Sequence, residues 1–432
     1  MNAQLCPRLS ANGDVRPLHI LSLSLEYTPT ISGGVGTHAQ ELAAGLSKSD
    51  RVTVVACTLG KPERLSEENL TVYLLPPTDK NENFLARTSI AAGILQYNRQ
   101  LVRFARNVLL RSNQKPDLIQ CYNWITFPAA RELARLLGVP VVAIVQFVSE
   151  PIENWWGQTP DPEIVSQESQ VFQSADMIIT VSNSMKAVIQ RQHAIPDSKI
   201  SVVHNGMDTR AFREEAQCNS HVDAICRDIA SKNEKIVLYA GRIHPQKGIS
   251  ALLESAAVVL RRNKNVRYLV AGAPDSREAT REFRGILDSD TTLRERLLLV
   301  GKLDRPCLAQ LYGRAHVALV PSVYEPFGYA AIEAMAAGVP LVASDCGGLS
   351  EIVQHEQTGL LIPVSGGEGV HVVDARSLAE ATERLLTDNL LANQLAEAAR
   401  RRADEVFSLE PMVRATRRIY VETLARSMSP TA

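Results

Sequence analysis

The sequence predicts an α/β protein built from two doubly wound domains. Its 432 residues exceed the usual size of a single domain. Short runs rich in β-branched residues alternate with longer segments of helical periodicity, which is the pattern of parallel strands joined by crossover helices. Each half of the chain carries its own set of such runs. We therefore expect two parallel sheets, with ligands bound at the carboxyl ends of their strands.

The expected elements follow one another as strand, loop and helix. In the first half we expect strands at 18–24, 51–57, 70–75, 117–121, 140–146 and 176–182, and helices at 35–47, 88–112 and 163–174. In the second half we expect strands at 201–204, 235–241, 266–272, 297–301, 316–321, 339–344 and 360–363, and helices at 249–262, 329–337 and 376–406. The polar stretch 213–234 is expected to be a surface excursion. A last helix is expected at 409–427.

The composition argues against several classes of protein. The formal net charge is −1, with 45% hydrophobic and 22% charged residues, so we expect no global attraction to nucleic acid or to an anionic membrane. The first residues lack the charged start and apolar core of a signal peptide, and no apolar run approaches the ~20 residues of a membrane helix. The seven cysteines form no C-x-x-C pair, so reduced thiols and a cytoplasmic location are expected.

A glycine-rich segment follows the first expected strand. Gly33, Gly34 and Gly36 would let the backbone approach a ligand closely before a helix begins. The spacing superficially matches a dinucleotide fingerprint, but roughly ten residues separate it from the strand and no acidic residue ends the second strand. The alternative is an ordinary glycine-rich turn.

A basic loop follows the expected strand 235–241. It runs from Arg242 to Lys247 and Gly248, and a helix begins directly after it. Cations beside a helix N-terminus suit a diphosphate, because the helix supplies N–H donors and the side chains supply charge. The spacing differs from that of a Walker A motif. The alternative is a solvated basic loop.

Two carboxylates flank the start of an apolar helix in the second half. Glu325 lies in the turn after the expected strand 316–321, and Glu333 lies within the expected helix 329–337. Burying a lone carboxylate among residues as apolar as YAAIEAMAAG is costly, which indicates a function. One carboxylate would face a sugar beside the phosphates and the other a ribose. The alternative is a pair of solvated glutamates.

Two weaker patterns have simpler explanations. Asp288 and Asp290 resemble an Asp-x-Asp metal site, but no strand precedes them, and a helix-end cap is the preferred interpretation. We find no other metal-ligand spacing and expect no metal. Regularly spaced arginines in 88–112 would suit a helix lying on a membrane surface, but a domain helix with a solvated basic face is the preferred interpretation. These arginines are Arg99, Arg103, Arg106 and Arg111.

Together these motifs resemble family four of the retaining glycosyltransferases with the GT-B fold, which includes relatives of glycogen and sucrose synthases. EPFGYAAIE, with Glu325 and Glu333, resembles the family's Glu-x7-Glu motif. GRIHPQKG resembles the segment whose arginine and lysine hold the donor diphosphate. HNGMD at 204–208 resembles the join between the domains, and SGGVGTH at 32–38 resembles the N-terminal glycine loop.

The resemblance implies two Rossmann-like domains that face a cleft, with the final helix crossing back onto the first domain. Residues 1–203 with 409–432 would form the acceptor-side domain, and residues 204–408 would bind the nucleotide-sugar. The residues predicted to be catalytic are Glu325, Arg242 and Lys247. Those predicted to bind the donor are Gly33, Gly34, Gly36, Gln146, Phe327, Gly328, Tyr329 and Glu333. Those predicted to bind the acceptor are His38, Tyr122, Trp124 and Trp155, of which Trp155 could equally pack under a loop.

The sequence departs from the family at two places. Relatives carry a histidine, in a V-x-x-x-H pattern, where this chain has Gln146, and a common His-x-Trp becomes Tyr122-Asn123-Trp124. The histidine contacts the sugar near its C6 hydroxyl, whereas glutamine is an uncharged donor and acceptor. We therefore expect an unusual hexose or a longer-chain sugar as donor. The alternative is that Gln146 replaces the hydrogen bond to a normal hexose.

The predicted activity is transfer of a sugar, with retention of configuration, from a nucleoside diphosphate sugar to a small natural-product acceptor. No cofactor and no metal is expected. The alternatives are a nucleotide-sugar 2-epimerase of the same fold, a polysaccharide-directed transferase and a non-catalytic binding protein. Partners should be the two small substrates, without nucleic acid or stable membrane insertion. The sugar, the nucleotide base, the acceptor and the oligomeric state stay open.

Overall fold

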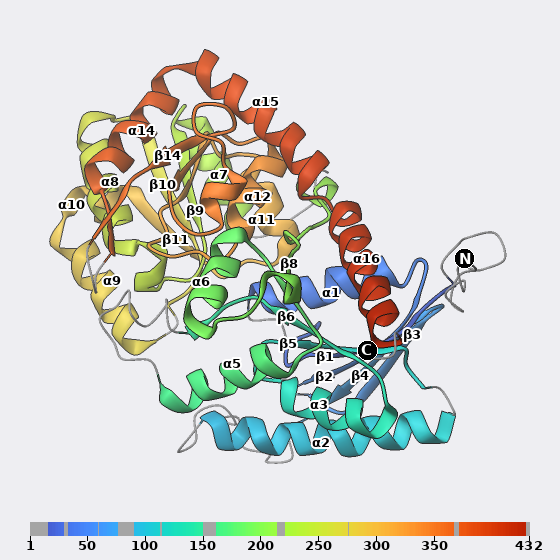
Figure 1. Ribbon diagram of the computed structural model, residues 1–432. Coiled ribbons are helices and arrows are strands. Elements are labelled where there is room, and N and C mark those ends of the chain that lie inside the picture. Colours follow the sequence, from blue (N-terminus) through green and yellow to red (C-terminus); the bar gives the residue numbers. More distant parts are fainter. Residues whose placement is uncertain are drawn as a thin grey trace. The chain divides into compact units, whose positions relative to one another are not determined.

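The computed structural model in Figure 1 describes most of the chain. The described residues are 16–29, 33–58, 60–76, 90–112, 115–149, 161–213, 221–274, 276–366 and 371–428. They divide into two compact units. The first comprises the described residues up to Ser149, those of 160–207, and the final helix from Leu409, and the second comprises Asp208–Ser408. The sequence places the join at residue 204, whereas the units divide between Met207 and Asp208.

The first unit is built on an eight-stranded sheet in the order β3-β4-β2-β1-β5-β6-β7-β8. Its strands are β1 (His19–Leu23), β2 (Arg51–Cys57), β3 (Glu63–Glu67), β4 (Leu70–Leu75), β5 (Leu118–Tyr122), β6 (Val141–Val145), β7 (Met177–Thr180) and β8 (Ile200–Val202). All neighbours pair in parallel except β3, which runs antiparallel to β4 at the edge. The chain moves outward from β1 to β2 and then returns to β5 on the other side. The topological switch point, where such sheets bind ligands, therefore lies between β1 and β5.

Two layers of helices cover this sheet (Figure 1). The helices are α1 (Gly34–Leu46), α2 (Ile90–Ser112), α3 (Phe127–Leu137), α5 (Pro162–Ser174), α6 (Asn183–His193) and α16 (Leu409–Met428). On one face, α2, α3, α5 and α6 enclose a core that includes Leu101, Phe127 and Ile189. On the other face, α1 and α16 enclose a core that includes Leu42 and Tyr420. Short apolar strands that are buried on both faces are typical of a parallel sheet.

The second unit has a six-stranded, all-parallel sheet in the order β11-β10-β9-β12-β13-β14. Its strands are β9 (Lys235–Ala240), β10 (Val266–Ala271), β11 (Leu297–Gly301), β12 (Val317–Val320), β13 (Leu341–Ser344) and β14 (Leu360–Ile362). A separate hairpin pairs β15 (Val364–Gly366) with β16 (His371–Val373). After β11 the chain returns to the other side of β9. The switch point therefore lies between β9 and β12.

Helices cover both faces of the second sheet as well. They are α7 (His221–Ser231), α8 (Ile249–Arg262), α9 (Arg277–Ser289), α10 (Thr291–Arg296), α11 (Arg305–Tyr312), α12 (Tyr329–Ala337), α13 (Leu349–Ile352), α14 (Ala375–Thr387) and α15 (Asn389–Val406). Residues of α8, α9, α10 and α14 share one core with the strands. α7 and α12 contact β9, β12 and β13.

Nearly all expected strands and helices are confirmed, and the bounds expected for 249–262 and 329–337 are those of α8 and α12. Three expectations are wrong. The stretch 213–234 contains the helix α7, which buries Val222, Cys226 and Ile229. The helix expected at 376–406 is two helices, because Asp388 ends α14 and its carboxylate caps α15. The strand counted with the second half at 201–204 is β8, which pairs with β7 in the first sheet.

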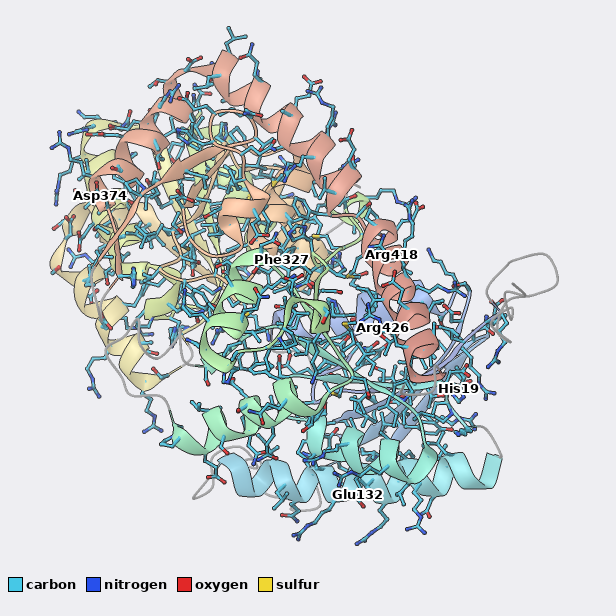
Figure 2. All side chains as sticks on the ribbon, viewed as in Figure 1. His19, Glu132, Phe327, Asp374, Arg418 and Arg426 are labelled. Carbon is cyan, nitrogen blue, oxygen red and sulfur yellow. The ribbon has the colours of Figure 1, made fainter. Side chains whose placement is uncertain are left out.

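The final helix α16 belongs to the first unit, which confirms that the end of the chain crosses back. The Arg417 guanidinium donates to both carboxylate oxygens of the buried Asp50, at 2.7 and 3.1 Å. A Cβ on Gly45 of α1 would lie 2.3 Å from Val413 Cγ2, so the two helices need glycine there to pack this closely. Figure 2 shows Arg418 and Arg426 on the exposed side of α16.

The cysteines differ in part from the expectation of reduced thiols. Cys307 is disulfide-bonded. Four other cysteines among the described residues are free and buried: Cys57, Cys121, Cys226 and Cys346. Burial raises the pKa of the Cys57 thiol to about 11 and that of Cys346 to about 12, so both remain protonated thiols at neutral pH. In the part of the chain that the structure describes, no helix is both long and apolar enough to span a membrane.

Candidate active site

The candidate residues of the second unit gather at the carboxyl ends of β9, β12 and β13. Arg242 and Lys247 follow β9, and Lys247 ends the short 3-10 helix η3 (Pro245–Lys247) directly before α8. Glu325 follows β12, in the loop that leads to α12. Because β9 and β12 are neighbours in the sheet, the two loops lie side by side. This is the switch point where a doubly wound sheet binds its ligand.

Lys247 and Glu325 form an ion pair across this switch point. Lys247 Nζ lies 2.5 Å from Glu325 Oε2, and the two side chains are only 19% and 14% exposed. The Ser322 hydroxyl donates to the same carboxylate oxygen at 3.3 Å. A cation and a carboxylate that the sequence assigns to diphosphate and sugar are therefore already side by side. The sequence suggested both residues but not their pairing.

The backbone around the pair is packed so tightly that two positions require glycine. Gly248 has φ +67°, and a Cβ there would lie 1.8 Å from the carbonyl oxygen of Pro321. Gly347, after β13, has φ +50°, and a Cβ there would lie 2.2 Å from the carbonyl oxygen of Glu325. At both positions the positive φ angle and the close carbonyl oxygen exclude any residue with a side chain. These contacts hold the loops after β9, β12 and β13 against one another.

Arg242 lies at the rim of this cluster. Its side chain is exposed, and its carbonyl oxygen accepts a hydrogen bond of 2.7 Å from the Tyr239 hydroxyl. The Arg242 backbone is thus anchored to β9, while the guanidinium reaches the solvent at the carboxyl end of the sheet. An exposed arginine on a fixed backbone suits the binding of an anionic group, because its planar fork matches phosphate oxygens.

Glu333 lies on α12, and its side chain is half-buried. Desolvation raises the pKa of its carboxyl from 4.5 to about 7, against the opposing effects of Arg305 and of a hydrogen bond from the Tyr312 hydroxyl. That bond is 3.3 Å long. A carboxyl group whose pKa is strongly raised by burial is costly for stability and is often functional. The apolar composition of the segment predicted the burial, whereas the partners Arg305 and Tyr312 come from α11.

We expect Glu333→Gln to stabilise the protein more at pH 8 than at pH 5. The raised pKa means that the folded state favours the protonated carboxyl. Its stabilising contribution is complete below pH 4.5 and is lost as the pH rises through about 7. The glutamine variant does not titrate, so its advantage should grow by ~1–3 kcal/mol, which thermal melts at both pH values would measure. The same variant should bind a nucleoside diphosphate more weakly if Glu333 holds the ribose. An advantage independent of pH would contradict the raised pKa, and unchanged diphosphate binding would contradict the ribose assignment.

The start of α12 is formed by predicted donor-binding residues. Gly328 precedes the helix with φ +129°, and Phe327 is 4% exposed. The Phe327 ring lies 5.7 Å from the Tyr329 ring and 6.2 Å from the Phe407 ring, in edge-to-face geometry. Figure 2 labels Phe327 in this part of the second unit. Phe327 therefore packs inside the unit, and the backbone at the start of α12 is the part of this segment that a ligand would meet.

In the first unit, the glycine segment forms the start of α1. Gly33 is the residue before the helix, and α1 begins at Gly34. A Cβ on Gly33 would meet no atom within 4 Å, so the space beside it is open. The N–H groups of the first turn of a helix have no partners within the helix, which makes this an appropriate place for an anionic oxygen.

Gln146 follows β6, at the carboxyl ends of the strands of the first sheet. Its Nε2 donates to Asn205 Oδ1 at 3.2 Å, and Asn205 Nδ2 donates to Gln146 Oε1 at 2.9 Å. Its backbone N–H donates to Asn123 Oδ1 at 2.8 Å. Gln146 is 7% exposed, and its amide is matched to a second amide. Neither Asn205 nor Asn123 was predicted to contact Gln146, although Asn205 lies within the join motif HNGMD and Asn123 within Tyr122-Asn123-Trp124.

The predicted acceptor residues do not share one surface. Tyr122 packs in the core beneath α1 and α16, whereas Trp124 packs in the core beneath α2 and α3, on the other face of the sheet. His38 of α1 is 3% exposed and lies beside Tyr122, with His38 Nδ1 and the Tyr122 hydroxyl 3.1 Å apart. Trp155 lies outside the described residues. The structure therefore brings His38 and Tyr122 together and separates Trp124 from them.

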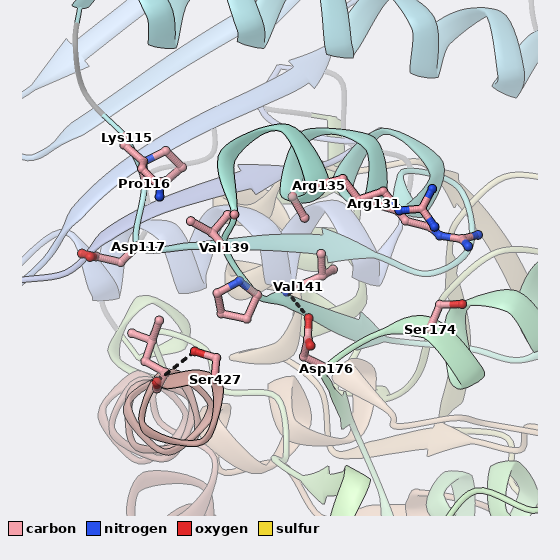
Figure 3. Close-up of a pocket in the computed structure, with 14 residues that line it drawn as sticks. Lys115, Pro116, Asp117, Arg131, Arg135, Val139, Val141, Ser174, Asp176 and Ser427 are labelled. Carbon is pink, nitrogen blue, oxygen red and sulfur yellow. Dashed lines mark hydrogen bonds between the residues drawn. The ribbon is translucent and has the colours of Figure 1, made fainter. Parts of the chain in front are cut away.

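A cavity of about 650 Å³ lies at the opposite edge of the first sheet (Figure 3). Lys115, Asp117, Val141 and Asp176 line it just before or at the start of strands β5, β6 and β7, together with residues of α3 and α16. Asp176 Oδ2 accepts a hydrogen bond of 2.8 Å from the backbone N–H of Val141. Because substrates bind at the carboxyl ends of parallel strands, this cavity does not belong to the candidate site.

Of the two aspartates that resemble a metal site, Asp290 has a structural role, which agrees with the helix-end cap preferred for this pair. Asp290 Oδ1 accepts hydrogen bonds from the backbone N–H groups of Thr292 and Leu293, at 2.8 and 3.1 Å, and so caps α10. Its carboxylate also pairs with Arg261. In the ranges that the structure describes, no three His, Cys, Asp or Glu side chains are grouped as metal ligands would be.

Comparisons with known proteins agree with this arrangement. Residues 224–402 match the family model described as glycosyl transferases group 1, and residues 32–211 match the model described as glycosyltransferase family 4. A glycogen synthase of Mycobacterium tuberculosis is 28% identical over 418 residues, which cover 94% of this chain and 94% of that protein. An alpha-maltose-1-phosphate synthase of Mycolicibacterium smegmatis is 29% identical over 409 residues, covering 93% and 99%.

A solved structure shows the same fold. The sucrose-phosphate synthase of Thermosynechococcus elongatus superposes with a TM-score of 0.78, over 95% of this chain and 100% of that one, at 23% identity. The two matching family models meet near the division between the compact units. The similarity therefore extends over both units and includes the loops that carry Arg242, Lys247 and Glu325 and the helix that carries Glu333.

Proposed function

The chain belongs to family four of the GT-B glycosyltransferases, and we propose that it transfers a sugar from a nucleoside diphosphate sugar to a small-molecule acceptor with retention of configuration. One observation carries the proposal. A lysine and a glutamate with the spacing of the family's donor motifs form an ion pair at the switch point of the second sheet, 2.5 Å apart. The side chains of Lys247 and Glu325 are 19% and 14% exposed. The ammonium could therefore contact the phosphates of a ligand while the carboxylate contacts its hydroxyls.

In the proposed mechanism, the main difficulty is the charge of the leaving diphosphate. Lys247, Arg242 and the N–H groups at the start of α12 would stabilise the departing oxygens, since preorganised donors act strongly on charge that develops in the transition state. Glu325 would orient the hydroxyls of the donor sugar, and Glu333 would hold the ribose. A leaving phosphate oxygen would take the proton of the acceptor on the face from which the diphosphate leaves, which gives retention without a separate base.

A glucan is the second candidate acceptor. It is favoured by the similarity to glycogen synthase, whereas the similarity to alpha-maltose-1-phosphate synthase favours a small phosphorylated sugar. The test combines binding and turnover. Uridine, adenosine and guanosine diphosphate sugars are screened by thermal shift, because a ligand at 100 times its Kd stabilises by ~2.7 kcal/mol. The donors that bind are then offered with glycogen, sugar phosphates and small alcohols.

The products decide between these functions. A small glycoside with the anomeric configuration of the donor, measured by NMR, would support the proposal, and an inverted linkage would refute retention. Elongation of glycogen alone would favour the second candidate. Conversion of the nucleotide-sugar into its epimer, with no sugar transferred, would identify an epimerase. Binding of a nucleotide-sugar without any product would indicate a non-catalytic binding protein.

Activity is expected to survive excess EDTA. Arg242 and Lys247 supply two positive charges for the diphosphate, and Asp290, the best acidic candidate from the sequence, is committed to the cap of α10. Initial rates with a verified donor, with and without chelator, would measure this. Loss of activity that magnesium or manganese restores would show that a metal is required.

Gln146→His is expected to impair transfer from the native donor, which we propose to be a modified hexose or a longer-chain sugar in natural-product biosynthesis. Each amide of the Gln146–Asn205 pair keeps one hydrogen and acceptor capacity for a substrate. A mismatched polar group left unpaired costs ~1–3 kcal/mol, which corresponds to roughly 5- to 150-fold in kcat/KM. Glucose, N-acetylglucosamine and mannose nucleotides serve as the comparison donors. Rapid transfer from one of these, undiminished in the variant, would refute the unusual donor.

A further inference from the structure

The first unit holds a cavity of about 650 Å³ at the amino ends of β5, β6 and β7, which the proposed transfer reaction does not use. Its walls come from the loop before β5, from α3 and the end of α5, from the residues that begin β6 and β7, and from the end of α16. Figure 3 shows Arg131 and Arg135 of α3 on one side of this cavity and Ser427 of α16 on the other. A volume of this size is typical of small-molecule sites.

Three cationic side chains line the cavity, those of Lys115, Arg131 and Arg135. Within the described ranges, no side chain or carbonyl group forms an ion pair or a hydrogen bond with the charged group of any of the three. Arg131 is half-buried, whereas Lys115 and Arg135 are exposed. A guanidinium that is partly withdrawn from water without a counter-ion is costly, which indicates that an anion binds beside it.

The two arginines lie one turn apart on the same face of α3. Arg135 belongs to the last turn of the helix, before Gly138, where the helix dipole stabilises a cation. Arg131 lies four residues earlier, and like charges at this spacing repel one another and destabilise a helix. The packing of α3 requires neither the unpaired charge of Arg131 nor this repulsion. A bound anion would remove both costs.

The carboxylates of the cavity do not neutralise these cations. Asp117 is engaged on both oxygens, since Oδ1 pairs with Arg16 at 2.7 Å and Oδ2 accepts from the backbone N–H of His19 at 2.9 Å. Asp176 Oδ2 accepts from the backbone N–H of Val141 at 2.8 Å, which leaves Oδ1 as an acceptor for a ligand. The cavity therefore combines an excess of positive charge with one available carboxylate oxygen.

This set of groups matches a phosphorylated sugar. Arginine and lysine bind phosphate oxygens through charge-assisted hydrogen bonds, and a carboxylate accepts hydrogen bonds from sugar hydroxyls. The Ser427 hydroxyl donates to the carbonyl of Leu424 at 2.9 Å, so its oxygen is a further acceptor. None of the described residues that line the cavity is aromatic, so it offers no ring on which a nucleotide base would stack.

We propose that this cavity binds a phosphorylated sugar, with Lys115, Arg131 and Arg135 on the phosphate and Asp176 on the sugar hydroxyls. The substrates of a doubly wound sheet bind at the carboxyl ends of its strands, whereas this cavity lies at the amino ends. It is therefore a second site, and a ligand bound there takes no part in the transfer. The proposal goes beyond the proposed function and does not depend on it, because binding is measured without donor or acceptor.

The probes are glucose 1-phosphate and glucose 6-phosphate, titrated into the full chain by calorimetry at constant ionic strength. Inorganic phosphate and glucose are the comparison ligands. We expect at least one sugar phosphate to bind about 10-fold more tightly than inorganic phosphate, and glucose not to bind measurably. Equal affinity for inorganic phosphate would show a general anion site and refute the sugar assignment. If neither sugar phosphate binds, the proposal is wrong.

Two variants test the phosphate contacts. Arg131→Gln and Arg135→Gln should each lower the affinity for the sugar phosphate about 10-fold or more, the value of one charge-assisted hydrogen bond. Arg103→Gln is the matched control, because Arg103 is an exposed arginine of α2 that does not line the cavity, and its variant should bind as the wild type does. Thermal melts show which variants are folded, and Arg135 is exposed, so its variant is informative even if Arg131→Gln is unstable. Unchanged affinity in the folded variants would exclude these arginines from the site.

Asp176→Asn tests the sugar contact. The amide oxygen of the asparagine can still accept from the Val141 N–H, whereas its NH2 group replaces the free carboxylate oxygen and can only donate. The affinity for the sugar phosphate should fall about 10-fold, while that for inorganic phosphate should not fall. A parallel fall for both ligands would contradict the assignment of Asp176 to the sugar.

A variant in the second unit separates the two sites. Lys247→Ala should bind the sugar phosphate as tightly as the wild type does, because Lys247 belongs to the candidate active site. Loss of binding in Lys247→Ala, together with full binding in Arg135→Gln, would place the sugar phosphate in the active site and overturn the second site. If the chain transferred sugar to no acceptor, the proposed function would fail, while these titrations would still decide what the cavity binds.

Discussion

Lys247→Ala is expected to lower turnover by about 10²-fold or more, the usual loss when one group that stabilises transition-state charge is removed. The ammonium lies at the switch point of the second sheet, 2.5 Å from Glu325 and directly before the start of α8. The leaving diphosphate gains negative charge as its bond to the sugar breaks, and water is a weaker substitute for a fixed cation. The loss should therefore appear in kcat as well as in donor binding.

The measurement is kcat with a verified donor, and a second lysine of the same unit is the control. Lys232 forms an exposed ion pair with Asp228, with Nζ and Oδ2 2.6 Å apart. Lys232→Ala removes the same charge before the amino end of β9, whereas the candidate site lies at its carboxyl end, so this variant should retain wild-type kinetics. Unchanged turnover in Lys247→Ala would exclude Lys247 from the diphosphate site.

Glu325→Gln is expected to lower kcat by about 10²-fold while the bare nucleoside diphosphate binds at least as tightly as before. The glutamine keeps the shape of the side chain but replaces charge-assisted hydrogen bonds to the sugar hydroxyls with weaker ones. The substitution also releases Lys247 from its carboxylate partner. The freed ammonium is available to the phosphates, and the value of such an ion pair, up to ~1 kcal/mol, corresponds to roughly a fivefold lower Kd.

The two readouts make this prediction specific. Titration calorimetry gives the Kd of the bare diphosphate, and initial rates give kcat. Glu383 serves as the control, since it pairs with Arg262 at 2.9 Å and is 21% exposed in the same unit. Glu383→Gln should change neither value. If the Kd of Glu325→Gln rises in parallel with the fall in kcat, Glu325 acts on the nucleotide and the assignment to the sugar is wrong.

Much of the fold is readable from the sequence because its signals are local. The helix α8 begins after the glycine of a basic loop, and α12 is an apolar segment, with Glu333 as its one charged residue, that ends before Gly338. Such patterns depend on residues a few positions apart. The helix α7 had a usable signal, buried residues at Val222, Cys226 and Ile229, which the polar residues around them obscured. The exposed edge strand β3 buries no residue and so has no apolar alternation to detect.

The sequence by itself determined that there are two parallel sheets and which residues enter the loops at their carboxyl ends. A motif such as GRIHPQKG or EPFGYAAIE carries its glycines and charges within one loop, so its chemistry can be read without knowledge of its neighbours. Only the tertiary structure decided the pairings. Lys247 and Glu325 are 78 residues apart, Gln146 and Asn205 are 59 apart, and Tyr420 and Gln120 are 300 apart. Strand order and helix crossing set these contacts, and burial then sets the charges of Glu333 and His38, because both depend on which side chains exclude water around them.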